Sequence, residues 1–447
     1  MPEVIVPAER RLGPIWLNQG VTRRNALTYL YAACFTIGLV AVTGFMQPYL
    51  LSNNLGMATG EEGRASSLLQ VSYEIVVLLA VGPLGALADR IGRRPIYALG
   101  FAWISVSFML FPLVENLTQL VLCRMFFGIG SACVTSMMAT VLADYPLDRS
   151  RGMLLAASGI GNGIGAISMV LILSQLPGFF GGMGYDALES GRMTYWFGAT
   201  LALISSVVVF RGLKAGVPGK PRGKQSVVSL LREGATAARK NPRVLVACAE
   251  AFVARGDLVV INTFFALWAR QVGVAGGLTL EQAISQAGKF VAMIALAQLL
   301  WSPIWGIILD RVDRLSALAG AMALATVAYI AAGLSPDPLA VAFIPVAIML
   351  GIGEGAAILS GAALIGQEAP REIRGSVIGL FNFCGSVGIL TISSVGGFLY
   401  DAFMPGAPFL FVGMVNLSIC VLAVIVRLRT GRRGPGEVVE QAEVGSR

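Results

Sequence analysis

Five ionisable side chains lie inside long apolar segments of this 447-residue chain, where a charge is hardest to accommodate. They are Glu74, Arg124, Arg255, Asp257 and Glu354. A charge at the centre of a bilayer costs roughly 2.5–3.5 kcal/mol, so five that face lipid would cost on the order of 12–18 kcal/mol. That sum is comparable with the whole stability of a domain, about 5–15 kcal/mol. We therefore expect these side chains to face a cavity or one another.

The chemistry open to these residues is the binding of protons and of small charged solutes. A carboxyl group in a partly dry cavity favours its neutral form, so Asp257 and Glu354 are the first candidates for binding a proton. The chain has no histidine, so a carboxylate must carry any transported proton. The guanidinium groups of Arg124 and Arg255 suit an anionic group on a solute. The alternatives are structural ion pairs between helices, for Glu74 above all, and the binding of a cation other than the proton.

Segment 244–270 carries the densest set of charges. Glu250 and Asp257 are seven residues apart and share one face of a helix. Arg255 lies about 200° round the helix from Asp257, so the two need not pair directly. We predict one carboxylate stripe and, separately, a stripe of Arg255 and Asn262. Glu250 is nearer the predicted inner surface and could simply be solvated there.

The elements that hold these residues are long apolar helices. Of all residues 56% are hydrophobic and 13% are charged, whereas a soluble domain carries about 25% charged residues. Each apolar segment is near the ~20 residues that cross a bilayer. We predict an all-α membrane protein with twelve transmembrane helices. The predicted spans are 26–51, 63–86, 95–114, 118–143, 152–176, 192–213, 244–270, 286–309, 315–334, 339–365, 375–400 and 405–427.

The net charge of +8 indicates membrane topology rather than nucleic-acid binding. Most of the 33 lysines and arginines fall in the loops and tails of one side. Cytoplasmic loops carry such an excess, so we predict a multi-pass protein of the cell (inner) membrane with both termini in the cytoplasm. The basic loops could also contact anionic lipid. Within the middle loop, residues 226–240 are predicted to form a short amphipathic helix on the inner membrane surface, and the alternative is a plain linker.

A repeated phrase divides the chain into two halves. "GALADRIGRR" spans Gly85–Arg94, and "GIILDRVDRL" spans Gly306–Leu315, at an offset of 306 − 85 = 221 residues. A second set of glycines and arginines repeats at an offset of 223. The chain is therefore two copies of one six-helix membrane unit. We predict an N-terminal bundle with its tail over 1–213, a basic linker over 214–243, and a C-terminal bundle with its tail over 244–447.

The repeated phrase resembles the inner-loop motif of the major facilitator superfamily, a class of twelve-helix secondary transporters. The resemblance covers essentially the whole chain, and it implies that the motif latches the cytoplasmic side shut. Asp313 stands where the first copy has Gly92, so the turn of the second copy must differ. The alternative is that the arginines only obey the positive-inside rule. The residues of this predicted gate are Gly85, Asp89, Arg90, Gly92, Arg93, Asp310, Arg311 and Arg314.

Two further motifs resemble the family to different degrees. Arg124 followed by Gly128 and Gly130 is similar to its second motif, whose arginine is associated with proton or substrate coupling. Gly161 and Gly165 match the spacing of the motif of drug–proton antiporters, but the proline and the glycine pair that continue that motif are missing. The resemblance also implies that helices 1, 4, 7 and 10 line a central cavity. Four of the five buried charges fall on these helices.

The sequence therefore favours a proton-coupled secondary transporter of a small organic solute, leaning to an organic anion, that works by alternating access. The alternative is a proton-driven exporter of drugs or amphiphilic compounds. A channel would not need duplicated latches. An enzyme would need a nucleophile with its base or metal ligands, and no such set is visible. We expect no cofactor and no metal, membrane lipids as neighbours, and a monomer. The six cysteines all lie in apolar segments and are predicted to be small apolar fillers.

Overall fold

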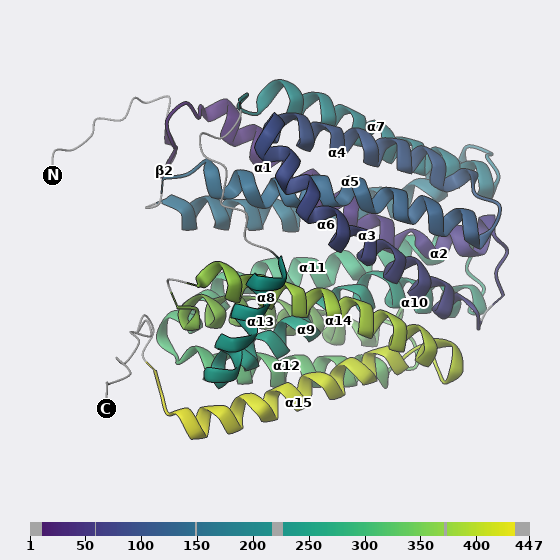
Figure 1. Ribbon diagram of the computed structural model, residues 1–447. Helices are drawn as coiled ribbons and strands as arrows, with labels where there is room; N and C mark the ends of the chain where they lie inside the picture. The colour runs from purple at the N-terminus through teal and green to yellow at the C-terminus, as the bar shows by residue number, and fades with distance from the viewer. Residues whose placement is uncertain (1–10, 59, 148–149, 217–226, 371–372, 434–447) are drawn as a thin grey trace, which may run out of the picture. The chain divides into compact units, whose positions relative to one another are not determined.

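The computed structural model describes residues 11–58, 60–147, 150–216, 227–370 and 373–433, and almost all of them are helical (Figure 1). Residues 1–10 and 434–447 of the two predicted tails, and residues 217–226 of the predicted linker, lie outside the described residues. The strands of the described residues are β1, Arg11–Leu12, and β2, Ile15–Trp16, which pair antiparallel. This hairpin belongs to a segment that we expected to be a plain tail.

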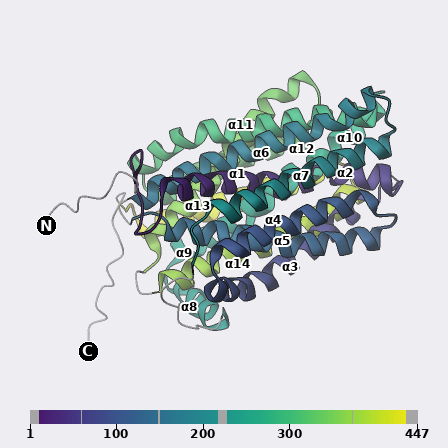
Figure 2. The ribbon, with the colours of Figure 1, turned by 90° about the horizontal axis from the view of Figure 1, so that it is seen from above.

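Contacts divide the chain into two compact units. Unit 1 comprises Met1–Ala58, Leu68–Arg222 and Gly277–Ala292, and unit 2 comprises Thr59–Ser67, Gly223–Gly276 and Met293–Arg447. In unit 1, α1, α4, α5, α6 and α7 run alongside one another (Figures 1 and 2). The helices that begin in the first half of the chain are α1 Arg23–Phe45, α2 Gln47–Tyr49, the π-helical turn η2 Leu50–Asn54, α3 Glu62–Ile91, α4 Arg93–Leu110, the 3-10 turn η3 Phe111–Leu113, α5 Leu117–Asp144, α6 Arg151–Gly182 and α7 Ala187–Gly212.

Unit 2 repeats this arrangement, with one additional short helix. α8 packs against α14 in both views, and Ser376 donates a hydrogen bond of 2.7 Å to Glu233. The middle loop therefore forms an amphipathic helix rather than a plain linker in this stretch. The helices of the second half are α8 Val227–Lys240, α9 Pro242–Val259, the π-helical turn η5 Val260–Phe264, α10 Phe265–Ala275, α11 Leu280–Arg311, α12 Arg314–Gly333, the 3-10 turn η6 Val341–Phe343, α13 Ile344–Glu368, α14 Arg374–Ala402 and α15 Ala407–Thr430.

Eleven helical segments of the described residues are long and apolar enough to cross a membrane. The predicted seventh span is formed by α9, η5 and α10, which follow one another without a break over residues 242–275. Its first part carries the charges of Arg243, Glu250, Arg255 and Asp257, which lower its hydropathy. The twelve-helix expectation is confirmed, and the seventh helix is the one that departs from an apolar span.

Close helix contacts explain where the sequence needs glycine. A Cβ atom added to Gly165 on α6 would lie 1.9 Å from the backbone oxygen of Cys34 on α1. One turn earlier, a Cβ atom added to Gly161 would lie 3.6 Å from the backbone oxygen of Leu30, which is ordinary contact. The two helices therefore touch most closely at Gly165, and the glycine pair of the fifth predicted span has one critical member.

This difference predicts the outcome of a matched pair of substitutions. Gly165→Ala should destabilise unit 1 by roughly 1–3 kcal/mol, because the methyl group overlaps a backbone atom that cannot move away. Gly161→Ala should be neutral or slightly stabilising, because alanine loses less conformational entropy in a helix than glycine does. Thermal unfolding of the two purified variants in detergent measures the difference. Equal unfolding temperatures would contradict the close contact at Gly165.

Candidate functional site

Asp257 on α9 and Glu354 on α13 form a buried carboxylate pair in unit 2. Their exposed fractions are 0% and 2%, and α9 packs against α13. The two groups are electrostatic neighbours. Both carboxylate oxygens of Asp257 and Oε1 of Glu354 lack a hydrogen-bond partner, and no basic side chain of the described residues pairs with either group. The structure thus brings together the two residues that the sequence analysis chose for proton binding.

Asn416 and Tyr329 complete this cluster, and sequence reasoning missed both. Asn416 on α15 lies beside Asp257 as a hydrogen-bonding neighbour, although neither amide atom reaches standard hydrogen-bond geometry. The hydroxyl group of Tyr329 on α12 faces both carboxylates and also has no partner among the described residues. Asn416 had a visible signal, because it is the one amide in the strongly apolar α15. Tyr329 had none, since a tyrosine in an apolar span is usually a packing residue.

A helix irregularity lies next to the pair. The π-helical turn η5 begins three residues after Asp257, and within it Asn262 donates 2.8 Å to the backbone oxygen of Leu258. Single π-turns inside α-helices are rare and occur frequently at functional sites. The turn changes the register of the seventh span immediately beyond Asp257, so the residues before and after it face different neighbours.

Glu250 is buried rather than solvated. Its exposed fraction is 1%, and a Cβ atom added to Gly361 on α13 would lie 1.6 Å from its Oε2 atom. The possibility that Glu250 sits in water at the inner surface is therefore wrong, and the carboxylate stripe of α9 is entirely internal. No group of three or more His, Cys, Asp or Glu side chains in the described part of the chain could hold a metal ion.

Arg255 lies on the other side of α9 from Asp257, as the helical spacing predicts. Its side chain is exposed and donates 2.7 Å to Oδ1 of Asn382 on α14. Asn262, the predicted partner on the same face, bonds to its own helix instead. The predicted stripe of Arg255 and Asn262 is therefore replaced by a contact between α9 and α14.

Arg124 on α5 occupies an aromatic site inside unit 1. Its exposed fraction is 4%, and its guanidinium carbon lies 4.9 Å from the ring centre of Tyr73 and 5.5 Å from that of Phe127. Nη2 donates to Oε1 of Gln70 at 3.3 Å, while Nε and Nη1 have no hydrogen-bond partner among the described residues. Such a cation over ring faces is stabilised without being neutralised. Arg124 therefore retains two buried donors that an anion could accept.

Two more polar residues lie near this arginine site, and Glu74 is the predicted one. Glu74 is buried beside Tyr73 on α3 and interacts with it electrostatically. Ser131, one of the residues on the same face of α5, forms a 2.7 Å hydrogen bond with the hydroxyl group of Tyr73. Tyr73 is not among the residues predicted from the sequence, because its contact with Arg124 cannot be read from spacing within one helix.

The first inner motif, Gly85–Arg94, is organised around Arg93. Arg93 Nε lies 2.5 Å from the carboxylate of Asp144 at the end of α5, and Nη2 lies 3.5 Å from Asp89. Gly92 has a φ of 98°, and a Cβ atom there would lie 2.7 Å from the backbone oxygen of Gly216. Glycine is thus required at this turn, as predicted.

Other residues of the first motif are less constrained. A Cβ atom added to Gly85 would meet nothing within 4 Å, so no close helix contact within unit 1 requires a glycine there. Arg90 is exposed. These two positions therefore contribute no contact that explains their residue types within unit 1.

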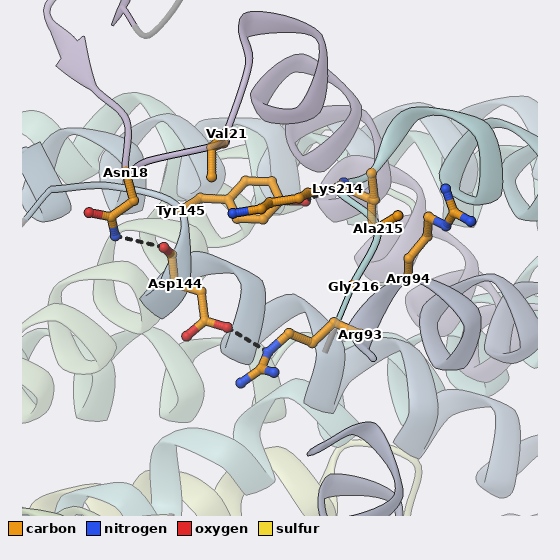
Figure 3. Close-up of a pocket in the computed structure, with 10 residues that line it drawn as sticks. Asn18, Val21, Arg93, Arg94, Asp144, Tyr145, Lys214, Ala215 and Gly216 are labelled. Carbon is orange, nitrogen blue, oxygen red and sulfur yellow. Dashed lines mark hydrogen bonds and ion pairs between the residues drawn. The ribbon is translucent and has the colours of Figure 1, made fainter. Parts of the chain in front are cut away.

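A pocket of about 280 Å³ lies beside Arg93 and Asp144 (Figure 3). Asn18, just after the β-hairpin, donates 2.8 Å to the backbone oxygen of Asp144 and so attaches the N-terminal segment to this site. Burial raises the pKa of Tyr145 to about 12, and its hydroxyl group accepts a hydrogen bond of 3.0 Å from the backbone of Lys214. Tyr145 therefore stays neutral near pH 7. The lining residues are Asn18, Val21, Arg93, Arg94, Asp144, Tyr145, Leu213, Lys214, Ala215 and Gly216.

The second inner motif, Gly306–Leu315, is built on Asp313 and not on the predicted Asp310. Asp310 and Arg311 are exposed and form no ion pair among the described residues. Arg314 donates 2.8 Å to the backbone oxygen of Ala363. Asp313, with a φ of −52°, caps α12 by accepting a hydrogen bond from the backbone of Ser316 at 3.0 Å. The turn differs from that at Gly92, as its sequence predicts.

Asp313 is part of a buried ion-pair network at the ends of several helices of unit 2. It lies 3.2 Å from Arg243 and 3.1 Å from Arg427. Arg243 is completely buried and lies 3.4 Å from Glu368, which also pairs with Arg433 at 2.5 Å. The sequence did not reveal this network because its members come from four separate segments of the chain.

The network predicts a dependence of stability on pH. Burial would raise the pKa of Asp313, but hydrogen bonds from Ser316 and Arg433 and the charge of Arg243 outweigh it, so the pKa lies below its usual range. A lowered carboxyl pKa contributes stability above the ordinary value of about 4, and this stability is lost as the pH falls through the lower folded-state pKa. Asp313→Asn should therefore lower the unfolding temperature at pH 7, and the difference from wild type should shrink as the pH falls towards 3.

The exposed Asp310 provides the matched control for this experiment. Asp310→Asn should leave the unfolding temperature unchanged at every pH, because an exposed carboxylate without a partner contributes little to stability. A difference between wild type and Asp313→Asn that stays constant from pH 7 to pH 3 would show that Asp313 does not act through its charge.

Comparisons with known proteins agree with this architecture. The chain is 26% identical over 428 residues to the magnetosome protein MamH of Paramagnetospirillum magneticum, covering 93% of this chain and 95% of that protein. It is 27% identical over 403 residues to MamZ of the same organism, covering 87% of this chain but only 61% of MamZ. The solved structure of the nucleoside transporter NupG has a TM-score of 0.66 at 16% identity, covering 91% of this chain and 99% of that one, and shows the same fold.

The sequence profile of the Major Facilitator Superfamily matches residues 28–283 and again residues 251–444. The two matches overlap over residues 251–283 and together span nearly all of the chain. The members of this family are transporters and not enzymes, and their substrates are small molecules. This chain belongs to the Major Facilitator Superfamily and is a multi-pass membrane transporter of a small-molecule substrate.

Proposed function

We propose that this protein is a proton-coupled transporter of a small organic anion, working by alternating access. The observation that carries the proposal is the buried pair of Asp257 and Glu354, which has no compensating basic group among the described residues. Two ionised carboxylates buried side by side repel each other, and each also pays a large desolvation cost. The pair is therefore expected to hold at least one proton, which it can release when the local environment changes.

The choice of a proton over a metal ion follows from the ligands. Divalent cations take six or more oxygen ligands in proteins, or fewer with waters retained. Here two carboxylates, one amide and one phenol converge in an interior with exposed fractions of 2% or less. The absence of a larger ligand cluster among the described residues favours the proton. Sodium is the remaining monovalent candidate, and replacing it with choline in the transport assay separates the two.

Arg124 is the proposed contact for the anionic group of the solute. Its two unpartnered donors lie in a buried site with aromatic walls, where a carboxylate would replace lost hydration with charge-assisted hydrogen bonds. A binding site for cationic drugs would not contain an unneutralised arginine, because the two positive charges would repel each other. The missing proline and glycine pair in the fifth predicted span also sets this chain apart from typical drug–proton antiporters.

The inner motifs are proposed to act as conformational latches, with Arg93, Asp89 and Asp144 as the first of them. We place both termini in the cytoplasm and the protein in the inner membrane, on the distribution of lysine and arginine. Asp144→Asn removes the shorter of the two ion pairs and should alter the reactivity of a cysteine introduced on the outer side. Unchanged reactivity together with normal turnover would argue that these charges serve topology alone. The relatives MamH and MamZ are named after a compartment, the magnetosome, and their names mention no transported solute.

A direct experiment tests the proposal. A panel of mono- and dicarboxylates is screened for an increase in the unfolding temperature of the purified protein, since a bound ligand stabilises the folded state. The most stabilising compound is then supplied, radiolabelled, to proteoliposomes with and without a pH gradient. We expect accumulation that requires the gradient and is abolished by a protonophore. Accumulation that follows a sodium gradient and ignores the pH gradient would replace the proton with sodium.

A further inference from the structure

Helices α9 and α14 of unit 2 lie against each other in parallel register. A Cβ atom added to Gly388 would lie 1.7 Å from the backbone oxygen of Phe252, so the two backbones touch there. One turn further along, a Cβ atom added to Gly256 would lie 2.2 Å from Cδ1 of Ile392. Both pairs are separated by 136 residues (388 − 252 and 392 − 256). Residues at this offset therefore face one another across the contact.

Cys248 and Cys384 have the same offset, 384 − 248 = 136, and lie one helical turn before the contact of Phe252 with Gly388. Both cysteines are free, and their thiol groups are within hydrogen-bonding reach of each other. Spacing along the chain does not reveal this pair, because the two residues lie on different helices. The two backbones touch one helical turn away, and this closeness suits a disulfide, which needs a Cα–Cα distance of roughly 4.4–6.8 Å.

We propose that Cys248 and Cys384 are a redox-sensitive thiol pair that oxidises to a disulfide fixing α9 to α14. The oxidant is a peroxide. One thiol is oxidised by hydrogen peroxide to a sulfenic acid with release of one water. The second thiol attacks the sulfenic sulfur, the S–O bond breaks as the S–S bond forms, and the hydroxyl group leaves as a second water after taking up the thiol proton. Two thiols are thereby oxidised and one peroxide is reduced.

Exposure assigns the two roles within this reaction. Cys384 is only half-buried, whereas Cys248 has an exposed fraction of 4%. The accessible Cys384 is therefore the thiol that meets the oxidant, and the buried Cys248 is the one that resolves the sulfenic acid. Cys248 lies six residues into α9, about 9 Å from the start of the helix. A small uncharged peroxide can reach that depth.

The fold does not require thiols at this level. The corresponding contact in unit 1 has Leu30 on α1 and Gly161 on α6, one turn before the close contact of Cys34 with Gly165. The internal repeat thus shows that the same packing is built without a cysteine pair. In unit 2 the disulfide would join α14 to the helix that carries Asp257, nine residues after Cys248. Oxidation should therefore restrict the movement of α9.

The test uses the purified full chain in proteoliposomes, treated with hydrogen peroxide. Wild-type protein should lose the mass of two hydrogen atoms, and peptide mapping should join the segments around Cys248 and Cys384. Its unfolding temperature should rise by several degrees, because the bridge closes a long loop. Amide hydrogen exchange in the first turns of α9 should slow, and dithiothreitol should reverse all four changes. Cys248→Ser and Cys384→Ser should show none of them.

Cys133→Ser is the matched control, since Cys133 is also buried but lies on α5 in unit 1. It should behave as the wild type does. A disulfide that still forms in Cys248→Ser, or peroxide-treated wild-type protein in which both thiols remain reactive after unfolding, would overturn the proposal. Because these readouts need no transported solute, failure here leaves the proton-coupling proposal untouched, and failure of proton coupling leaves the thiol pair untouched.

Discussion

Asp257→Asn is expected to abolish the accumulation of solute against its gradient while exchange of solute across the membrane continues. Asparagine has nearly the shape of protonated aspartic acid but cannot release a proton, so the cycle runs without a coupling ion. We expect at least a tenfold fall in gradient-driven accumulation, equivalent to about 1.4 kcal/mol or more of lost driving force. Uptake of radiolabelled solute into proteoliposomes with an imposed pH gradient measures this, and counterflow measures exchange.

Glu250→Gln is the matched control for this substitution. Glu250 is a buried carboxylate on the same helix and an electrostatic neighbour of Asp257, but its side chain packs against Gly361. Its replacement should leave accumulation dependent on the pH gradient. If Asp257→Asn accumulates solute as the wild type does, Asp257 is a structural residue and the coupling assignment is wrong.

Arg124→Lys is expected to weaken solute binding about tenfold, and Arg124→Ala to weaken it further. Lysine keeps the positive charge but loses the planar donor pair that can hold a carboxylate in two hydrogen bonds. Hydrogen bonds to charged groups contribute about 1.5–3 kcal/mol each, which sets the scale of the loss. The dissociation constant of the stabilising carboxylate, measured by calorimetry on each purified variant, gives the result.

The fold of the Arg124 variants must be checked separately, because this side chain also packs against Tyr73 and Phe127. Removing it leaves a cavity and an unpaired acceptor on Gln70. An unfolding temperature close to that of wild type, combined with weaker binding, identifies a ligand contact. Normal folding with unaltered affinity and pH dependence would make Arg124 a structural charge and would remove the main support for an anionic solute.

The sequence predicts the architecture well because membrane helices are constrained by length and polarity. The twelve spans follow from the need to satisfy every backbone hydrogen bond within lipid, and the repeated phrase at Gly85 and Gly306 marks the two halves. Among the described residues, the seventh span is not one of the eleven segments apolar enough to cross a membrane, and its charges make it functionally informative. The cost of burying charge likewise predicted that the five ionisable residues face a cavity or one another, and Asp257 and Glu354 do lie together.

Contacts between distant segments could not be predicted in the same way. Asn416, Tyr329 and the thiol pair of Cys248 with Cys384 depend on how separate helices pack, and one chain without its relatives carries no record of this. The second inner motif shows the limit clearly. Its match to the first motif pointed to Asp310, whereas the substitution of Asp313 for Gly92 created a new helix cap and ion-pair centre. The possibility that Glu250 is solvated was wrong for a related reason. The position of a residue along a helix does not reveal which neighbouring helices bury it.

Proton binding by Asp257 and Glu354 is the proposal on which the transport mechanism depends, and proton movement during transport tests it most directly. Proteoliposomes are loaded with a pH-sensitive dye, given no imposed pH gradient, and supplied with the carboxylate that stabilises the protein best. A protonophore-treated sample and the anion-transport background of empty liposomes serve as references. The account predicts that downhill solute flux through wild-type protein shifts the internal pH, and that flux through Asp257→Asn does not. Solute flux through the wild type with no change in internal pH would contradict it.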